Sequence, residues 1–141
     1  MPKKKELYGI KKEWPSKRRL DESVARLRQR RKRTIINRVL ETFAEQQPSR
    51  HKLSAAAAMA GVSPCHFSRL FLSVTGKSFR QYFLELRIEK AKQLLADETV
   101  KTYYVAESCG YKELSSFSRA FKKETGKYPG QYRAGVLIGE K

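Results

Sequence analysis

The segment Phe67-Ser68-Arg69-Leu70-Phe71 returns fifty residues later in the chain as Phe117-Ser118-Arg119-Ala120-Phe121. The likeness continues on both sides of this segment. Downstream, Thr75-Gly76-Lys77 matches Thr125-Gly126-Lys127 and Gln81-Tyr82 matches Gln131-Tyr132, while upstream Ala57 and Gly61 match Ala106 and Gly110. The upstream pairs are offset by forty-nine residues, so the second copy has one extra residue in its turn. A repeat of this length in one register predicts a structural unit that is built twice.

Each copy has the pattern of two helices joined by a tight turn. In the first copy, residues 53–60 are rich in alanine, which has the highest helix propensity. Gly61 follows where a positive φ would let the chain turn, and Ser63-Pro64 has the residue types of an N-cap and a first helical position. The helix that begins there should end at Gly76. With the matching segments of the second copy, the sequence predicts helix-turn-helix units over residues 53–75 and 102–125.

A segment without glycine or proline, residues 78–96, joins the two units and predicts a helix of about 28 Å, at about 1.5 Å per residue. Its apolar residues form two stripes on opposite sides of the helix. One stripe holds Phe79, Tyr82, Phe83 and Leu86, and the other holds Leu84, Ile88, Ala91 and Leu95. Because one buried face needs only one stripe, we expect a different lobe to dock on each end. With a helix over residues 35–43, a last short helix from Pro129 and no strand, the predicted fold class is all-α.

The charge of the chain indicates a polyanionic partner. Its 141 residues include 31 Lys or Arg and 14 Asp or Glu, a net charge of +17, which favours nucleic acid or an anionic membrane. No apolar run is long enough to cross a bilayer, so no membrane partner is expected.

Residues 1–33 hold 14 basic and 4 acidic residues, and we interpret them as a basic arm that is partly flexible or helical. Residues 34–136 would then form the domain, and residues 137–141 a tail. The arm could follow phosphates or enter a minor groove, as flexible basic arms do. A solubilising tail, a remnant linker and a partner-binding segment stay open as alternatives.

The second helix of each unit presents a similar outward face. At about 100° per residue, with Phe67 toward the core, the outward residues are Cys65, Ser68, Arg69 and Leu72. In the second copy they are Ser115, Ser118, Arg119 and Lys122. A small polar residue beside an arginine suits a helix in the major groove, because small side chains admit the backbone and arginine can donate two hydrogen bonds to guanine. The pair could instead be plain solvated surface, and each arginine could contact phosphate rather than a base.

Residues 35–133 carry a series of motifs that is similar to the AraC/XylS-type DNA-binding domain. In order, the motifs are Gly61-Val62-Ser63-Pro64, Phe67-Ser68-Arg69-Leu70-Phe71, Thr75-Gly76, Arg87-Ile88-Glu89-Lys90-Ala91, Leu94-Leu95, Ala106, Gly110-Tyr111, Phe117-Ser118-Arg119-Ala120-Phe121-Lys122, Gly126, Pro129 and Tyr132-Arg133. The resemblance implies an all-α domain of about seven helices, in which a long central helix joins two helix-turn-helix subdomains. It also implies bacterial transcription control, most often activation.

By position, the resemblance implies base-reading roles for residues of both recognition helices, namely Cys65, Ser68, Arg69, Leu114, Ser115, Ser118 and Arg119. Leu114, the apolar member, could instead pack inward or touch a thymine methyl. We expect phosphate contacts from basic residues elsewhere in the repeat region, namely Lys77, Arg87, Lys90, Lys122 and Lys127. Because a repeat along the chain relates the units, one chain should read an asymmetric site in two successive major grooves, about 10 bp apart.

The sequence thus predicts a cytoplasmic, nucleoid-associated regulator that binds double-stranded DNA sequence-specifically and activates transcription by touching RNA polymerase. One alternative is an architectural protein that coats DNA through charge, and another is an interaction module whose basic arm docks an acidic protein. The residues that precede the matched region are too few to enclose a ligand. We therefore expect no small-molecule effector site, and either a stand-alone regulator or a fragment of a larger one.

No catalytic, metal or cofactor motif is found in the sequence. A glycine-rich phosphate loop and a nucleophile paired with a base are both missing, which argues against an enzyme. The cysteines and histidines do not have the spacing of a zinc site. Cys65 could be redox-active, although we favour a small residue chosen for close approach to DNA. Cys109 is interpreted as a small core residue, and Tyr103 and Tyr104 as packing residues of the second unit.

Overall fold

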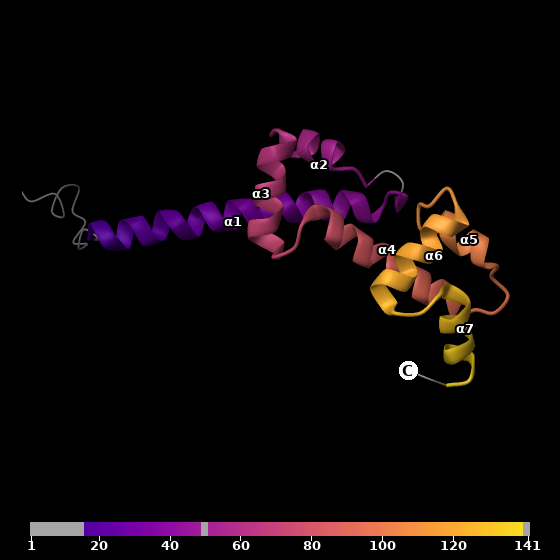
Figure 1. The fold of residues 1–141 in the computed structure, drawn as a ribbon. Coiled ribbons are helices and arrows are strands. Elements are labelled where there is room, and N and C mark those ends of the chain that lie inside the picture. Colours follow the sequence, from indigo (N-terminus) through magenta and orange to yellow (C-terminus); the bar gives the residue numbers. More distant parts are fainter. Residues whose placement is uncertain (1–15, 49–50, 140–141) are drawn as a thin grey trace, which may run out of the picture. The chain divides into compact units, whose positions relative to one another are not determined.

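The computed structural model describes residues 16–48 and 51–139, and this part of the chain forms seven helices and no strands (Figure 1). The helices are α1 (Lys17–Ala44), α2 (Leu53–Ala60), α3 (Pro64–Thr75), α4 (Phe79–Leu95), α5 (Thr102–Ser108), α6 (Leu114–Thr125) and α7 (Pro129–Leu137). The predicted all-α class is confirmed. The helix pairs α2–α3 and α5–α6 form the two helix-turn-helix units, and α4 lies between them in the chain.

The first helix is longer than the apolar periodicity predicts. α1 begins at Lys17 and continues without interruption into the helix expected over residues 35–43, because residues 17–34 contain no glycine or proline. A hydrogen-bonded ion pair from Arg18 Nε to Glu22 Oε1, at 3.2 Å, supports its first turns. Residues 1–15 of the predicted arm lie outside the described residues.

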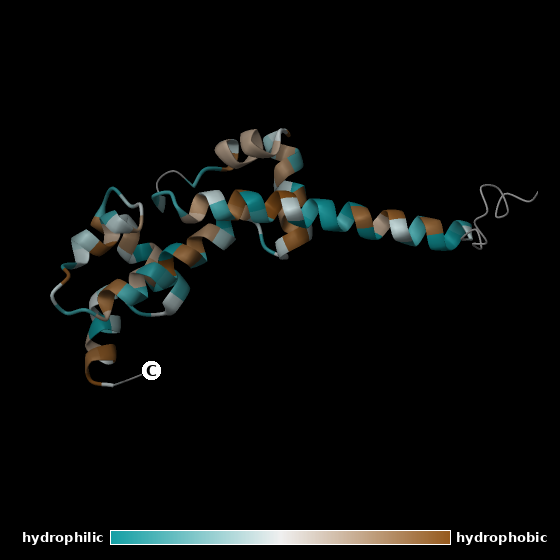
Figure 2. Ribbon diagram, turned by 180° about the vertical axis from the view of Figure 1, so that it is seen from behind, coloured by the Kyte–Doolittle hydropathy of each residue, from teal (hydrophilic) through white to brown (hydrophobic). Residues whose placement is uncertain are grey.

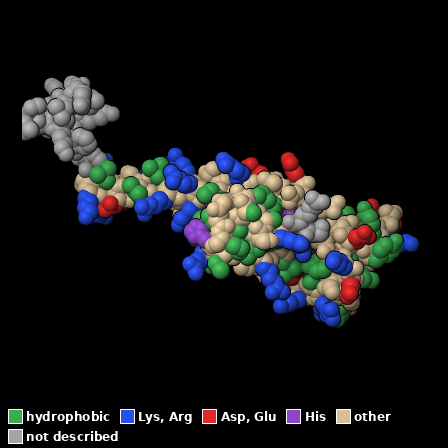
Figure 3. All heavy atoms as spheres, turned by 90° about the horizontal axis from the view of Figure 1, so that it is seen from above, with side chains coloured by type: hydrophobic (Ala, Val, Ile, Leu, Met, Phe, Trp, Pro, Cys, Tyr) green, Lys and Arg blue, Asp and Glu red, His purple; other side chains and the backbone are tan. Residues whose placement is uncertain are grey.

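The contacts within the chain divide it between Thr34 and Ile35 into an N-terminal part and a main part, and both helix-turn-helix units belong to the main part. Within the N-terminal part, the described residues 16–34 contain no buried residue. Its apolar side chains Leu20, Val24 and Leu27 are exposed, and Figure 3 shows Lys and Arg side chains on both sides of this part of α1. All buried residues of α1 therefore lie in the main part of the chain.

The turn of the first helix-turn-helix unit is built by the residues that the sequence marks for it. Gly61 ends α2 in the left-handed conformation, with φ of +70°, and its backbone N–H reaches the last carbonyls of α2. The Ser63 side chain then caps α3 by accepting a hydrogen bond from the His66 backbone N–H at 3.2 Å. Pro64 occupies the first helical position, where its missing N–H costs nothing.

The second unit repeats this turn with different local chemistry. Gly110 has a φ of +90°, and the Tyr111 backbone N–H closes the turn on the Ala106 carbonyl at 3.0 Å. The N-cap of α6 is Glu113, whose side chain makes no capping hydrogen bond. The two turns thus close with the same backbone hydrogen bond, Val62 N–H to the Ala57 carbonyl in the first unit, although the second turn has one more residue before its second helix. Only the first has a side-chain cap on its second helix.

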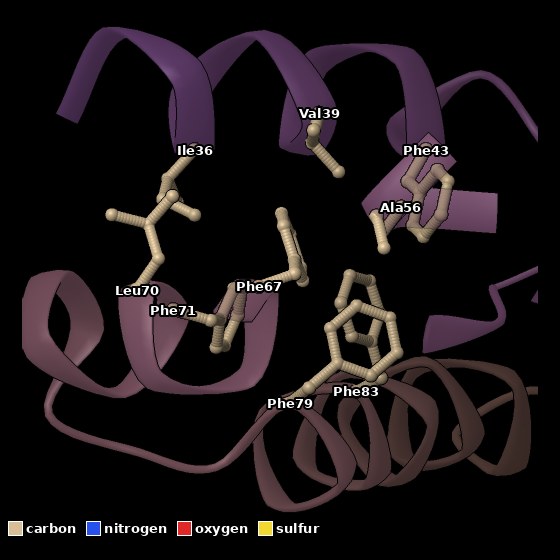
Figure 4. Packing of buried hydrophobic residues seen from close by; sticks show 10 residues of the cluster. Ile36, Val39, Phe43, Ala56, Phe67, Leu70, Phe71, Phe79 and Phe83 are labelled. Atoms are coloured by element: carbon tan, nitrogen blue, oxygen red, sulfur yellow. The ribbon is translucent and has the colours of Figure 1, made fainter. Parts of the chain in front are cut away.

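Two separate hydrophobic cores form on α4. The first core packs around aromatic rings of α1, α3 and the start of α4 (Figure 4), and its buried members are Ile36, Val39, Phe43, Ala56, Ala57, Phe67, Leu70, Phe71, Phe79 and Phe83. Within it, the rings of Phe79 and Phe83 lie 4.5 Å apart between centroids, and the His51 ring stacks on Phe43 at 5.1 Å. The alanine-rich α2, drawn as a predominantly apolar helix in Figure 2, contributes Ala56 and Ala57.

The second core packs around the C-terminal half of α4, and its buried members are Ile88, Ala91, Leu95, Val105, Ala106, Cys109, Phe117 and Phe121. The two predicted stripes of α4 are therefore confirmed, since Phe79 and Phe83 enter the first core and Ile88 enters the second. The placement of Leu86 in the first stripe was wrong, because its side chain is 48% exposed. The first core ends at Phe83, one helical turn before Leu86, so about half of the Leu86 side chain stays exposed.

Candidate nucleic-acid interface

α3 and α6 are the second helices of the two units, and each is fixed by a pair of fully buried phenylalanines. Phe67 and Phe71 anchor α3 in the first core, while Phe117 and Phe121 anchor α6 in the second. The ring of Phe117 also lies 5.6 Å from that of Tyr111, just after the turn. These anchors determine which side of each helix faces outward.

The predicted outward arginines are exposed in both helices. Arg69 on α3 and Arg119 on α6 each lie two residues after a buried phenylalanine, so the two helices present them in the same phase. Cys65 and Ser115, at matching positions near the helix starts, are exposed as well. Each arginine has a half-buried serine before it, Ser68 or Ser118, at the edge of the outward face rather than at its centre.

Leu114 does not pack inward. It is the first residue of α6, and 44% of its side chain is exposed. Of the two roles that the sequence left open for Leu114, inward packing is excluded, and contact with a thymine methyl stays a prediction. Leu72 on α3 is also exposed, so each of the two helices carries an apolar side chain beside its polar ones.

The predicted phosphate-binding lysines are exposed, and they also have contacts within the protein. Lys77 pairs with Glu85 on α4, and its hydrogen bond is the main reason why the pKa of Glu85 lies below its usual value. Lys90 Nζ donates to the Ser108 carbonyl at 2.9 Å, and Lys122 Nζ donates to the Gly126 carbonyl at 2.7 Å. Lys127 lies in the segment that follows α6, where its backbone N–H donates to Thr125 Oγ1 at 3.3 Å. All four keep their charge at the surface.

Arg87 differs from these lysines. Its Nη2 donates to the Pro48 carbonyl at 2.9 Å, and its guanidinium carbon lies 5.8 Å from the centre of the Tyr111 ring. Its Nε is buried and has no hydrogen-bond partner among the described residues. Of the five residues predicted to bind phosphate, Arg87 is thus the one whose charged group is directed into the protein.

The interpretation of Tyr103 and Tyr104 as packing residues was wrong, since 59% and 54% of these side chains are exposed. α5 buries Val105 and Ala106, with Cys109 just beyond its end, and these residues share one side of the helix. Helical geometry places both tyrosines away from that side. Tyr103 and Leu114 lie together on the rim of a surface depression of about 460 Å³.

The two cysteines are in contrasting surroundings. Cys109 is buried as predicted, and burial raises the pKa of its thiol from the usual 9.0 to about 11, although the charges of Lys90 and Arg87 act in the opposite direction. Cys65 is exposed on α3.

No group of His, Cys, Asp or Glu within residues 16–48 and 51–139 is arranged to hold a metal ion. Across the same ranges, no helix has the length and hydropathy to span a membrane.

Comparisons with known proteins agree with this geometry. The family model described as a helix-turn-helix domain matches residues 56–135, which include both units apart from the first three residues of α2. Among curated relatives, the RCS-specific HTH-type transcriptional activator RclR of Escherichia coli K12 is 33% identical over 101 residues, which are 72% of this chain and 36% of that protein. The chain spans about a third of the length of the curated relatives that it matches most strongly.

Solved structures show the same fold. The C-terminal domain of AraT, a response regulator from Geobacillus stearothermophilus, superposes with a TM-score of 0.66 at 34% identity, and the match covers 71% of this chain and 84% of that one. The DNA-binding domain of AdpA, a global transcriptional factor determined in complex with a target DNA, gives a TM-score of 0.67 at 26% identity, over 72% of this chain and 92% of that one. An AraC-type DNA-binding regulator from Chromobacterium violaceum is also similar, with a TM-score of 0.56 at 27% identity over 62% of this chain and 79% of that one.

Proposed function

Since the chain belongs to the AraC-type family of helix-turn-helix DNA-binding domains, we propose that it recognises a specific site on double-stranded DNA and regulates transcription. In this proposal α3 and α6 enter two successive major grooves, about 10 bp apart. Because a repeat along the chain relates the two units, both half-sites have the same orientation. The complete site is asymmetric, and one chain occupies it.

The observation that carries the proposal is the matched phase of the two helices. Arg69 and Arg119 are both exposed, and the buried Phe67 and Phe117 hold the two helices in the same rotational setting. An arginine on an ordinary solvated surface has no reason to recur at the same position of a repeated unit. Two arginines in one phase supply the bidentate donors that guanine O6 and N7 accept.

The remaining outward residues complete the proposed base contacts. Cys65 and Ser115 are small residues near the helix starts, where they let the backbone come close to the bases. Ser68 and Ser118 offer hydroxyl groups that suit either a base or a phosphate. Leu114, exposed at the first position of α6, is suited to contact a thymine methyl.

Contacts to the DNA backbone would fix the register without carrying sequence information. We assign them to the exposed lysines Lys77, Lys90, Lys122 and Lys127, and to the basic residues of the arm over residues 1–33. These contacts release counterions, so they make binding strongly dependent on salt.

We further propose that the bound protein activates transcription by touching RNA polymerase. The description of the relative RclR as an activator supports this direction of control. The exposed rings of Tyr103 and Tyr104 provide apolar surface on the second unit that suits contact with a protein partner. A transcription assay with purified polymerase, run on a promoter that carries the selected site, tests this step separately from binding.

Selection of bound duplexes from a random library tests the DNA-binding proposal. We expect one enriched asymmetric sequence with two half-sites, bound about 10³-fold or more tightly than random duplex at physiological salt. An architectural protein that coats DNA would give equal affinities for selected and random duplexes. That result, or a symmetric enriched site bound by a single chain, would contradict the proposal.

A further inference from the structure

We propose that Arg87 is a positioning residue that sets the rotation of the second helix-turn-helix unit relative to the first, and thereby the spacing between the two half-sites on DNA. The inference rests on the proposed DNA-binding function and assigns to Arg87 a role different from phosphate binding. Its basis is the position of Arg87 on α4 and the contacts that its guanidinium makes.

Arg87 lies between the two cores on α4. Phe83, one turn earlier, is the last buried member of the first core, and Ile88, the next residue, is the first buried member of the second. No buried residue belongs to both cores. Apolar packing therefore holds each unit on its own part of α4, and contacts between the units further restrict the angle between them.

The guanidinium of Arg87 joins segments from both sides of this division. Its Nη2 donates to the carbonyl of Pro48, in the connection between α1 and α2, at 2.9 Å. On the other side its carbon lies 5.8 Å from the ring centre of Tyr111, which contacts Phe117 of the second core. Tyr111 directly follows the turn of the second unit, so the contact reaches the element that orients α6.

The surroundings explain why one residue can have such an effect. A depression of about 410 Å³ lies beside α4 at this point, with Phe79 and Phe83 on one side and Tyr111 and Glu124 on the other. A second hydrogen bond between these parts is longer, from Gln81 Nε2 to Glu124 Oε2 at 3.4 Å. Because the space is not filled by apolar side chains, rotation about α4 meets little steric resistance there, and the Arg87 contacts oppose it.

The same geometry argues against a phosphate contact by Arg87. Its Nε is enclosed by protein, and its Nη2 already donates to Pro48. A phosphate that approached in the usual bidentate manner would have to displace these contacts. The lysines assigned to phosphate contacts, in contrast, are exposed.

Distance measurement between α3 and α6 in the free protein tests the inference without any DNA. Cys65 is exposed and Cys109 is buried, so a spin label attaches to Cys65, and Ser115→Cys supplies the second site at the matching position of the repeat. We expect a narrow distance distribution in the parent chain. Arg87→Met keeps the apolar stem but removes the guanidinium, and it should broaden the distribution or shift its mean.

Binding to spaced sites measures the consequence. On duplexes in which one base pair is inserted between the selected half-sites, the unlabelled natural chain should lose affinity, and Arg87→Met should reduce that discrimination about three- to tenfold. The slope of affinity against salt should stay unchanged, because every contact to phosphate remains in place. Tyr111→Leu should relax the spacing preference similarly, and the double variant should add little to either single one.

Matched variants make each outcome decisive. Lys92→Met removes a positive charge from α4 at a residue that pairs with Glu89 of the same helix, and it should leave distances and spacing preference unchanged. Arg87→Lys keeps the charge without the planar fork and should relax the spacing preference partially, which provides a test if Arg87→Met does not fold.

An unaltered distance distribution in Arg87→Met or Arg87→Lys would overturn the inference. Equal decreases in affinity at all spacings with a smaller salt slope would overturn it too, in favour of phosphate binding. If the natural chain shows no sequence preference, the proposed function fails, whereas the label distances still report on Arg87.

Discussion

Arg133 on α7 donates a hydrogen bond from Nε to the carbonyl oxygen of Leu95, the last residue of α4, at 3.0 Å. Its Nη2 also donates to the carbonyl of Asp97, at 3.2 Å, and to that of Val100. One guanidinium thus satisfies the carbonyls that follow the end of α4 and places a positive charge at the negative end of the helix dipole. It ties the last helix to the central helix that carries both units.

We predict that Arg133→Met destabilises the protein by about 1–3 kcal/mol, because three backbone carbonyls, two of them part-buried, lose a charged donor. Unfolding in urea, followed by circular dichroism, measures this destabilisation. Lys112→Met, which removes a positive charge from an exposed position on the same unit, should change the free energy of unfolding by less than about 0.5 kcal/mol. Equal stabilities for the two variants would show that the carbonyl contacts contribute nothing.

Truncation of the proposed base-reading arginines should reduce specificity. Arg69→Ala and Arg119→Ala should each cost about 1–3 kcal/mol of binding free energy on the selected site and little on random duplex. Each substitution should also relax the preference at one half-site only. Fluorescence anisotropy with both duplexes at fixed salt provides the measurement, and equal effects on the two duplexes would assign the residue to phosphate contact.

The basic arm should act without regard to sequence. Removal of residues 1–33 takes away 14 Lys or Arg and should weaken binding to selected and random duplexes alike. The slope of log affinity against log salt should fall in magnitude by about 0.9 for each phosphate that the arm neutralises. A titration at several salt concentrations gives this slope, and an unchanged slope would mean that the arm does not contact DNA.

The two turns offer a matched test of helix capping. Ser63→Ala removes the side-chain oxygen that accepts from the His66 N–H, and it should cost about 0.5–2 kcal/mol of stability. Glu113→Ala alters the corresponding position of the second unit, where no side-chain cap exists, and should have a smaller effect. Thermal unfolding of both variants compares them directly, and an equal or larger destabilisation in Glu113→Ala would contradict this account.

Cys109 should make stability depend on pH in the alkaline range. The unfolded thiol ionises near its usual pKa of 9.0, whereas burial raises the folded value to about 11. Above pH 9 the unfolded chain therefore releases its proton first, and its ionisation favours unfolding. The stability advantage over Cys109→Ala should be constant below pH 9 and should shrink by about 2–3 kcal/mol as the pH rises through 11.

Much of the fold could be predicted because its signals are local. Gly61 and Ser63-Pro64 mark the first turn by their own backbone preferences, and the two apolar stripes of α4 indicate two lobes without any knowledge of their contents. The repeat supplied independent support, because each unit confirmed the interpretation of the other. The outward phase of Arg69 and Arg119 followed from the spacing to the phenylalanines before them.

Features that depend on distant contacts could not be predicted in this way. Arg87 bears a charge at a position typical of a surface residue, and only its bond to Pro48, 39 residues earlier in the chain, reveals an inward role. Tyr103 and Tyr104 are large and apolar, yet the short α5 has room for only one buried side. For α1, like charges at residues 28–33 repel one another and disfavour a helix, but the absence of glycine and proline prevailed.

Among the described residues, the two cores have no buried residue in common, so the two ends of the protein can change independently. A change that disturbs the packing around Phe117 leaves the aromatic cluster around Phe67 intact, so the damage stays confined to one end. Selection can then alter the preference of one recognition helix while the other keeps its hold on the target. Through such steps, a lineage of these proteins can move to a new promoter one half-site at a time.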